Sequence, residues 1–254
     1  MFVTIVIPTL NEEDYIGILL HSLAAQTYKN FEVIVVDGGS KDETQGRVLE
    51  FQGLLNLKFV KAPKKGVARQ RNFGASLAKS EHLMFMDADD YLDPDFMEKV
   101  TTHLKSHTSI DLLTTWLKPL SDKMRDRVMF YSFHKFYMDL VKKWKPVAGG
   151  AFIYIKKSVF MKLKGFRADL LVAEDFDLVY RAHEAGYKYD LLKKPPVHTS
   201  VRRLEQMGRP KYLWSLGKNA IYYQFRNVTK NVDWLVDYDL KEGGFYYKNP
   251  KARN

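Results

Sequence analysis

Short apolar runs rich in β-branched residues alternate with longer amphipathic stretches through the first half of this 254-residue chain. This alternation is typical of βαβ units, in which each buried parallel strand is followed by a covering helix. Five strands are predicted, over Val3–Ile7, Glu32–Val36, Leu57–Val60, His82–Met86 and Ile110–Thr114. Helices are predicted over Glu13–Ala25, Asp42–Phe51, Ala68–Ala78 and Asp95–Leu104. The pattern predicts an α/β fold with a mostly parallel central sheet flanked by helices.

The N-terminal residues, the length of the apolar stretches and the lack of cysteine limit the classes of protein to which this chain can belong. The first apolar run is too short and too acidic in its flank for a secretion signal, and it is predicted to be a strand. Nowhere does the sequence hold the roughly 18 apolar residues that a membrane-spanning helix needs. Cysteine is absent, which excludes disulfides, thiolate zinc sites and cysteine nucleophiles. A cytoplasmic protein, not secreted, is expected.

The net charge of +10 comes from one part of the chain. Residues 118–167 carry thirteen Lys and Arg against three Asp, whereas residues 1–117 are slightly acidic. A positive potential of this kind attracts nucleic acid, anionic lipid or a phosphorylated substrate, and it also suits a solvated face that keeps the protein soluble. Charge alone does not choose among these alternatives, but no known nucleic-acid-binding module accompanies the segment.

Residues 124–144 are predicted to form a helix with aromatic residues around much of its circumference and basic residues at both ends. It is either a core helix that covers the sheet or an interfacial helix that lies on lipid. Residues 209–230 repeat this composition. Peripheral contact with an anionic membrane on its cytoplasmic face is therefore one hypothesis.

Acidic side chains follow three of the predicted strands directly. Asp87 and Asp89 come after His82–Met86, and two carboxylates so placed can share Mg²⁺ or Mn²⁺ with diphosphate oxygens. An isolated D-x-D elsewhere is more often a turn. Asp37 follows a second strand, where it either accepts hydrogen bonds from a base or ribose or belongs to an ordinary strand–helix turn. Glu12 follows a third strand, next to Glu13 and Asp14 at a helix start, where capping explains part of the acidic pattern. Parallel strands deliver such groups to one edge of the sheet, where ligands bind.

Five sequence motifs resemble those of the family 2 glycosyltransferases, which have the Rossmann-like nucleotide-sugar-binding fold called GT-A. They are IVIPTLNEE, VVDGGSKDET, GVARQRNFGASLAK, FMDADD and GFRADLLVAEDFDLVYRAHEAGY, in the order of the family. The match covers about residues 2–200. It implies a GT-A domain over 1–200, with a nucleotide-binding half of about 1–117 and an acceptor-side half of 118–200, followed by a helical C-terminal extension over 201–254.

The resemblance also implies roles for individual residues. The nucleoside pocket would be lined by Pro8, Leu10, Glu12, Asp37 and Arg71, and Asp87 would approach the ribose. Asp89 would ligate the divalent metal, Mn²⁺ or Mg²⁺, that bridges the donor's diphosphate.

The second part of the match carries the reaction itself. Asp175, next to Glu174, would take the proton from the acceptor hydroxyl, although apart from the resemblance both residues are ordinary acidic first-turn residues of a helix. Further along, a metal ligand and two diphosphate-binding cations are expected at His198, Arg202 and Arg203, or else a structural His and a solvated Arg pair. Gly149 and Gly150 either let the donor sugar approach the backbone or begin the next strand.

The predicted activity is an inverting transfer of a sugar from a nucleotide diphosphate donor, with UDP favoured over GDP. The acceptor would be a hydroxyl or phosphate of a glycan or lipid-linked molecule, and nucleic acid is not an expected partner. Two alternatives are a non-catalytic GT-A-like scaffold and a sugar nucleotidyltransferase. The acidic motifs argue against the first, and the absence of a Gly-rich, Arg-containing N-terminal loop argues against the second.

Overall fold

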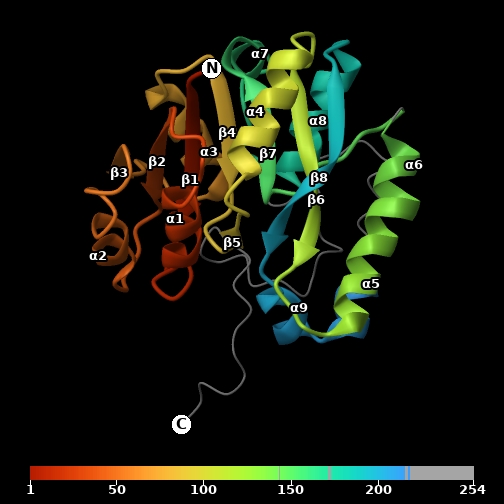
Figure 1. Cartoon of the computed structure of the whole chain (residues 1–254), viewed down its shortest axis with the longest axis horizontal. Helices are drawn as coiled ribbons and strands as arrows, with labels where there is room; N and C mark the ends of the chain where they lie inside the picture. The colour runs from red at the N-terminus through yellow and green to blue at the C-terminus, as the bar shows by residue number, and fades with distance from the viewer. Residues whose placement is uncertain (143, 171–172, 215–216, 218–254) are drawn as a thin grey trace.

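A twisted central sheet runs through the molecule (Figure 1) in the computed structural model, which describes residues 1–142, 144–170, 173–214 and 217. Within this part of the chain eight strands are hydrogen-bonded in the order β3-β2-β1-β4-β7-β6-β8-β5. They are β1 (Val3–Thr9), β2 (Phe31–Asp37), β3 (Leu57–Lys61), β4 (His82–Met86), β5 (Asp90–Tyr91), β6 (Leu112–Pro119), β7 (Phe152–Lys156) and β8 (Tyr189–Thr199).

The direction of the strands decides where the loops gather. β1 pairs in parallel with β2 and β4, and β2 with β3. β7 runs antiparallel to both of its neighbours, β4 and β6, so that β6 points the same way as β4. β8 is parallel to β6. The carboxyl ends of β1, β2, β4, β6 and β8 therefore meet at one edge of the sheet, together with the start of β7. This arrangement confirms a mostly parallel sheet, with antiparallel pairings at β7 and β5.

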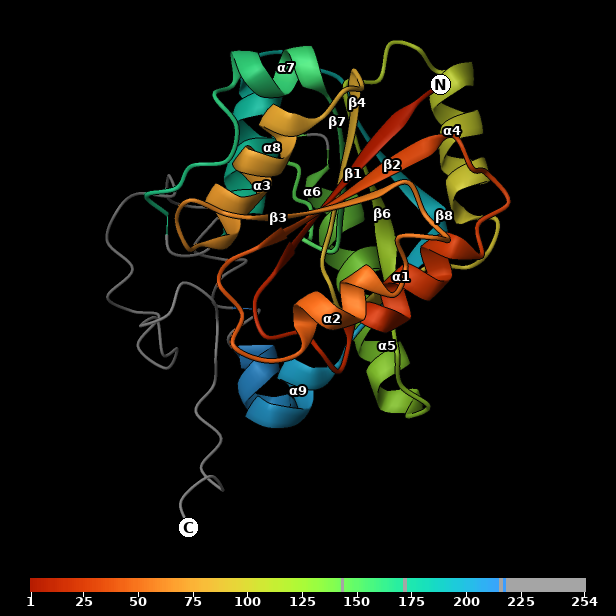
Figure 2. The ribbon, with the colours of Figure 1, turned by 90° about the vertical axis from the view of Figure 1, so that its left-hand side faces the viewer.

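Helices cover both faces of the sheet (Figure 2). One face is covered by α1 (Ile16–Ala24), α2 (Thr44–Leu49) and α4 (Phe96–Ser106), and the other by α3 (Val67–Leu77), α7 (Lys157–Lys162) and α8 (Glu174–Glu184). β1 is buried along its whole length because it has helices on both sides, which explains its continuous apolar sequence. The result is a three-layer α/β domain.

Close packing of α3 on β1 depends on a glycine. A Cβ atom at Gly74 would lie 2.3 Å from the Cγ1 atom of Val6, so any larger residue would push the helix off the sheet. On the opposite face, Leu20 of α1 is fully buried, and burial of one such side chain contributes about 1.5–3 kcal/mol. The apolar spacing seen in the sequence thus corresponds to helix faces that pack on the sheet.

A long helical segment stands beside β6 and β8 at one side of the molecule (Figure 1). It consists of α5 (Met124–Ser132), the π-helical turns η1 (Phe133–Met138) and α6 (Asp139–Val141). Its inner face packs Met138 and Val141 against Leu191 of β8. The predicted helix over 124–144 is confirmed over most of its length, and its inner face is part of a core cluster.

The structure corrects several boundaries. β5 and β8 were not predicted, whereas β7 agrees with one of the two alternatives for Gly149 and Gly150, the start of the next strand. β6 begins two residues later than the predicted strand and continues to Pro119. The predicted division at residue 117 falls inside β6, so it is not a break between elements. Past α9 (Arg202–Met207), residues 209–214 are helical, whereas 215–216 and 218–230 of the predicted helix lie outside the described residues. Among the residues that the structure describes, no helix has both the length and the apolar character to cross a bilayer.

Candidate active site

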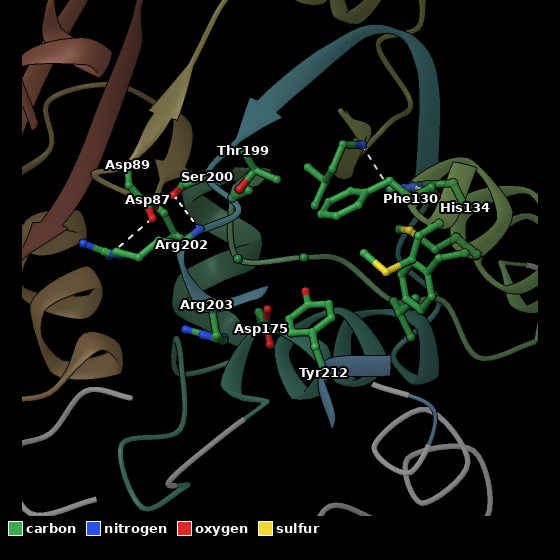
Figure 3. Close-up of a pocket in the computed structure, with 18 of the residues that line it drawn as sticks. Asp87, Asp89, Phe130, His134, Asp175, Thr199, Ser200, Arg202, Arg203 and Tyr212 are labelled. Carbon is green, nitrogen blue, oxygen red and sulfur yellow. Dashed lines mark hydrogen bonds and ion pairs between the residues drawn. The ribbon is translucent and has the colours of Figure 1, made fainter. Parts of the chain in front are cut away.

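A cavity of about 350 Å³ opens at the carboxyl edge of the sheet (Figure 3). Its polar part brings together seven residues that the sequence singled out, namely Asp87, Asp89, Gly149, Gly150, Asp175, Arg202 and Arg203. They come from the ends of β4 and β8, the start of β7 and the first turns of α8 and α9. The fold thus gathers side chains separated by more than 100 residues because their strands end at one edge.

The acidic end of the cavity follows β4 directly. Asp89 is crowded by protein and lies near Asp87, and both burial and the charge of Asp87 raise the pKa of the Asp89 carboxyl. Asp90 is fully buried one residue further, where burial and the same two negative charges raise its pKa well above the ordinary value. Three carboxyl groups within four residues at a strand end need positive charge nearby.

A single buried guanidinium group connects the end of β4 with the start of α8. Arg71 of α3 donates to the carboxylate of Asp87 at 2.7 Å and to that of Glu174 at 2.8 Å. Its side chain is only 2% exposed. The sequence placed Arg71 beside the nucleoside, but its guanidinium group lies in the interior, because two carboxylates there require a counter-charge. Arg71 therefore positions other site residues.

Gly150 lies where Asp87 and Asp175 come closest to the backbone. A Cβ atom at this position would be 2.9 Å from Nη2 of Arg71, 3.3 Å from Oδ2 of Asp87 and 3.4 Å from Oδ2 of Asp175. The Gly150 carbonyl also accepts a hydrogen bond from Arg71 at 3.3 Å. Only glycine fits between these groups, so the chain can pass between the two carboxylates without pushing them apart.

Asp175 stands in the first turn of α8 and keeps part of its surface open to the cavity. Burial, the charge of Glu174 and, more weakly, that of Asp87 raise the pKa of the Asp175 carboxyl to about 7. Arg71 and a hydrogen bond from the Phe176 N–H at 2.8 Å limit this rise. The helix begins after Ala173, whose φ of 57° is uncommon for a residue other than glycine. A carboxylate with a pKa near neutral is suited to accept a proton.

Arg202 lies between two acidic side chains at the acidic end of the cavity. It donates to both oxygens of Glu12 at 2.9 and 3.0 Å and lies 3.3 Å from Oδ2 of Asp89. Its guanidinium group stacks on the ring of Tyr15 at 4.3 Å. Burial raises the pKa of the Glu12 carboxyl even though Arg202 opposes this rise. The contact joins the start of α9 to the loop after β1, 190 residues earlier.

Apart from Arg71, which is in α3, the residues predicted to line the nucleoside pocket lie at the ends of β1 and β2, and none of them lines this cavity. Pro8 is in β1, Leu10 follows it, and the Asp37 carboxylate accepts hydrogen bonds from the backbone N–H groups of Gly39 and Ser40 at 2.9 and 3.1 Å. Bonds between the two loops, such as Asn11 N–H to Ser40 Oγ at 2.9 Å, hold them together. These loops form a rigid rim beside Asp87.

The two remaining predicted residues have different surroundings. His198 of β8 contacts Asp93, with Nε2 3.1 Å from Oδ2, and packs edge-on to the ring of Tyr91. It does not line the cavity, whereas Arg203 does. The place of His198 thus differs from that expected of a ligand beside Asp89.

The residues present fit a divalent cation only in part. Asp87 and Asp89 offer hard oxygen donors at the acidic end of the cavity, as Mg²⁺ and Mn²⁺ prefer. In the described residues no group of three or more His, Asp or Glu side chains is spaced to hold a metal. Such ions are commonly bound by one or two carboxylates, with phosphate oxygens of the substrate as further ligands. Asp87 and Asp89 match this arrangement.

The structure also shows site residues that the sequence did not single out. Thr199 and Ser200 line the cavity where β8 ends, and Tyr212 lies near Asp175 (Figure 3). Phe130 and Phe133 line its far side. The aromatic composition of residues 124–144 was the one signal of this wall, and it did not tell which side of the helix faces a cavity.

Solved structures with the same fold bind nucleotide sugars. The chain matches Staphylococcus aureus TarS 1–349 in complex with UDP-GlcNAc with a TM-score of 0.66, at 23% identity over 91% of this chain and 68% of that one. It matches the mannosyltransferase PcManGT from Pyrobaculum calidifontis, in complex with GDP-Man and Mn²⁺, with a TM-score of 0.69, at 22% identity over 89% and 65%. These likenesses establish the GT-A glycosyltransferase fold.

The sequence comparison identifies the family. The model for glycosyl transferase family 2 matches residues 4–164, well over half of the chain. The chain belongs to this family and is a glycosyltransferase, which confirms the resemblance. An uncharacterised glycosyltransferase of Rickettsia typhi is 27% identical over 84% of this chain and 70% of its own length. S. aureus TarS, a poly(ribitol-phosphate) beta-N-acetylglucosaminyltransferase, is 33% identical over half of this chain but only 23% of its own.

Proposed function

We propose that this glycosyltransferase moves a sugar from a nucleotide diphosphate sugar to an acceptor hydroxyl or phosphate in one displacement that inverts the anomeric centre. The observation that carries the proposal is the meeting of Asp87 and Asp175 at Gly150, since one atom at that position would lie within 3.4 Å of both carboxylates. Donor-binding and proton-accepting groups thus face the same small volume.

In the proposed reaction the acceptor oxygen attacks the anomeric carbon as the bond from that carbon to the diphosphate breaks. Asp175 accepts the proton of the attacking hydroxyl, and the nucleotide diphosphate leaves. Glu174 and Arg71 hold Asp175 in place, because the Arg71–Glu174 ion pair ties the first turn of α8 to α3. Gly149 and Gly150 leave room for the donor sugar beside the backbone.

The donor is proposed to lie with its nucleoside toward the rim formed by Pro8, Leu10 and Asp37, and with its diphosphate toward Asp89. Arg202 and Arg203 are near enough to that end to neutralise the leaving group. A bound Mn²⁺ or Mg²⁺ would supply Lewis-acid stabilisation of the negative charge on the diphosphate. Asp89, together with Asp87, would hold it. A UDP-sugar is favoured over a GDP-sugar, and the acceptor is a glycan or a lipid-linked molecule.

A thermal-shift screen of nucleotides and nucleotide sugars, with and without Mn²⁺, tests the proposal. A ligand that binds the folded state alone raises the melting temperature, by an amount that grows with its concentration over Kd. We expect a uridine or guanosine diphosphate to stabilise the protein only when Mn²⁺ is present. Asp89→Ala should lose most of this shift, whereas Asp93→Ala, a nearby acidic residue outside the cavity lining, should keep it. If nucleotide raises the melting temperature of the wild-type protein equally with and without Mn²⁺, the proposed role of the metal is wrong.

A further inference from the structure

The side of the cavity opposite Asp87 and Asp89 is apolar (Figure 3). Its wall is formed mainly by α5, η1 and the start of α8, through Met129, Phe130, Phe133, Met138, Val147 and Phe176. The hydroxyl groups of a free glycan gain nothing from such a wall, whereas a hydrocarbon chain is stabilised by leaving water there. The wall begins within the same cavity as Asp175.

His134 is the polar side chain that η1 contributes to this wall. Its ring is neutral, and both ring nitrogens are hydrogen-bonded within the protein. His134 Nδ1 lies 2.6 Å from the Phe130 carbonyl oxygen, and Nε2 accepts a hydrogen bond from the Leu117 N–H at 2.9 Å. These bonds fix a neutral ring with its proton on Nδ1, and burial lowers the pKa of His134. His134 therefore offers a ligand neither charge nor a free ring nitrogen.

The outer surface of the same helical segment is also apolar. Met124, Val128, Tyr131, Phe136, Leu140 and Trp144 are each between 55% and 70% exposed. A run of large exposed apolar side chains along one segment marks an interaction surface in a protein that is otherwise well packed. One helical segment thus presents apolar side chains to the cavity on one side and to the surroundings on the other.

Positive charge accompanies this surface. Residues 123–145 carry seven Lys and Arg against two Asp. Both aspartates are already paired within the protein, Asp126 with Arg209 at 2.6 Å and Asp139 with Lys193 at 2.8 Å. An apolar helix surface edged by cations, such as the exposed Arg125 and Lys135, matches the interface of an anionic bilayer, where apolar burial and charge attraction act together.

We propose that α5, η1 and α6 dock the enzyme on an anionic membrane and that the acceptor is an amphiphile of that membrane. Its hydrocarbon part would lie along Phe130 and Phe133, which brings its hydroxyl or phosphate head to Asp175. This inference rests on the proposed role of Asp175. It deepens that function by choosing a lipid acceptor over a free glycan, because a glycan would leave the apolar outer surface and its cations unexplained.

Co-sedimentation of the full chain with vesicles tests the docking surface. We expect binding to phosphatidylcholine vesicles that contain a quarter phosphatidylglycerol, and at least tenfold weaker binding to phosphatidylcholine alone. The double variant Phe136→Glu, Leu140→Glu should lose at least tenfold in binding to the anionic vesicles, since it places charge on the apolar surface. Leu54→Glu, also strongly exposed but in the nucleotide-binding half, should bind as wild type does. Equal binding to both vesicle types, or a double variant that sediments like wild type, would overturn the docking.

Calorimetric titration with n-decyl phosphate and ethyl phosphate tests the wall. The longer chain should bind at least tenfold more tightly because its methylene groups leave water, and Phe130→Gln should remove the difference. Equal affinity for the two phosphates in wild type overturns a lipid acceptor. The nucleotide screen separates the two proposals, because a wild type that binds nucleotide with Mn²⁺ but prefers neither anionic vesicles nor decyl phosphate refutes this inference alone.

Discussion

The charged part of the cavity and its apolar wall are built with opposite chemistry. The charged part consists of carboxylates, those of Asp87 and Asp89 among them, beside buried or half-buried arginines, Arg71 and Arg202. The wall consists mainly of Phe130, Phe133 and Met138 on a helical segment whose outer surface is apolar and cationic. One part is specified by compensated charge and the other by apolar surface.

This difference shows how each part depends on the rest of the molecule. The acidic groups at the end of β4 need cations brought from α3 and α9, so the charged part is complete only when distant segments have folded together. The apolar wall depends mainly on one helical segment packed on β6 and β8. Substitutions in the two parts should therefore differ in size and in what they change.

The largest effect is expected from Arg71→Met. Removing this guanidinium group leaves the buried Glu174 carboxylate without its counter-charge, which should lower the free energy of unfolding by about 3 kcal/mol. Denaturant unfolding followed by circular dichroism measures it. Arg69→Met, on an exposed position of the same helix, is the matched control and should change stability little. Equal stability of the two variants would show that the carboxylates do not depend on Arg71.

The next effect concerns turnover. Asp175→Asn keeps the shape of the side chain but cannot accept a proton, so kcat should fall by about a hundredfold or more while nucleotide binding is kept. Release of nucleotide diphosphate in the presence of acceptor measures kcat, and thermal shift measures binding. Asp169→Asn, exposed and paired with Arg167, is the control and should turn over normally. A fully active Asp175→Asn enzyme would refute the base assignment.

A smaller effect is expected from pH. A base must be ionised to act, and the pKa of Asp175 is raised to about 7, so its ionised fraction falls as pH drops below that value. The rate should decrease about tenfold per pH unit on the acid side, and the residual rate of Asp175→Asn should lose this dependence. A pH–rate profile from 5 to 9 checks both. A wild-type profile that is flat down to pH 5 would place the proton acceptor elsewhere.

The smallest effect is expected on the outer surface of the α5–α6 segment. Leu140→Gln replaces a side chain that is 62% exposed, so the free energy of unfolding should change by less than about 0.5 kcal/mol. Denaturant unfolding tests this beside Val141→Gln, its buried neighbour, which should be clearly destabilised. A large loss in Leu140→Gln would mean that the surface is part of the core.

The parts of the fold that the sequence predicts are those with local signals. β1, β2 and β4 are continuous apolar runs, and their ends carry Asp37, Asp87 and Asp89, so both the strands and the acidic edge could be predicted. β8 contains two consecutive prolines, which disfavour a strand, and it was missed because its pairing with β6 and β5 supplies the order. Nothing in the sequence indicated that β7 runs antiparallel to β4 and β6.

The contacts of the site could not be predicted for a different reason. Arg71 and Glu174 are 103 residues apart, and Arg202 and Glu12 are 190 residues apart. A single sequence tells which residues carry charge, but the choice of partner depends on which loops the sheet order brings together. The family resemblance supplied roles for these residues without their partners, so it did not indicate that Arg71 is buried against Glu174.

The position of β7 has a consequence for how such a chain can be divided. Residues 152–156 lie between β4 and β6 in the sheet and bond to both. A fragment ending near residue 117 would leave β4 as an open sheet edge with unpaired N–H and C=O groups, a known starting point for aggregation. Any exchange of segments meant to change the acceptor specificity would therefore have to keep β7 paired with both β4 and β6. An exchange confined to the α5–α6 segment leaves the pairing of the described strands intact.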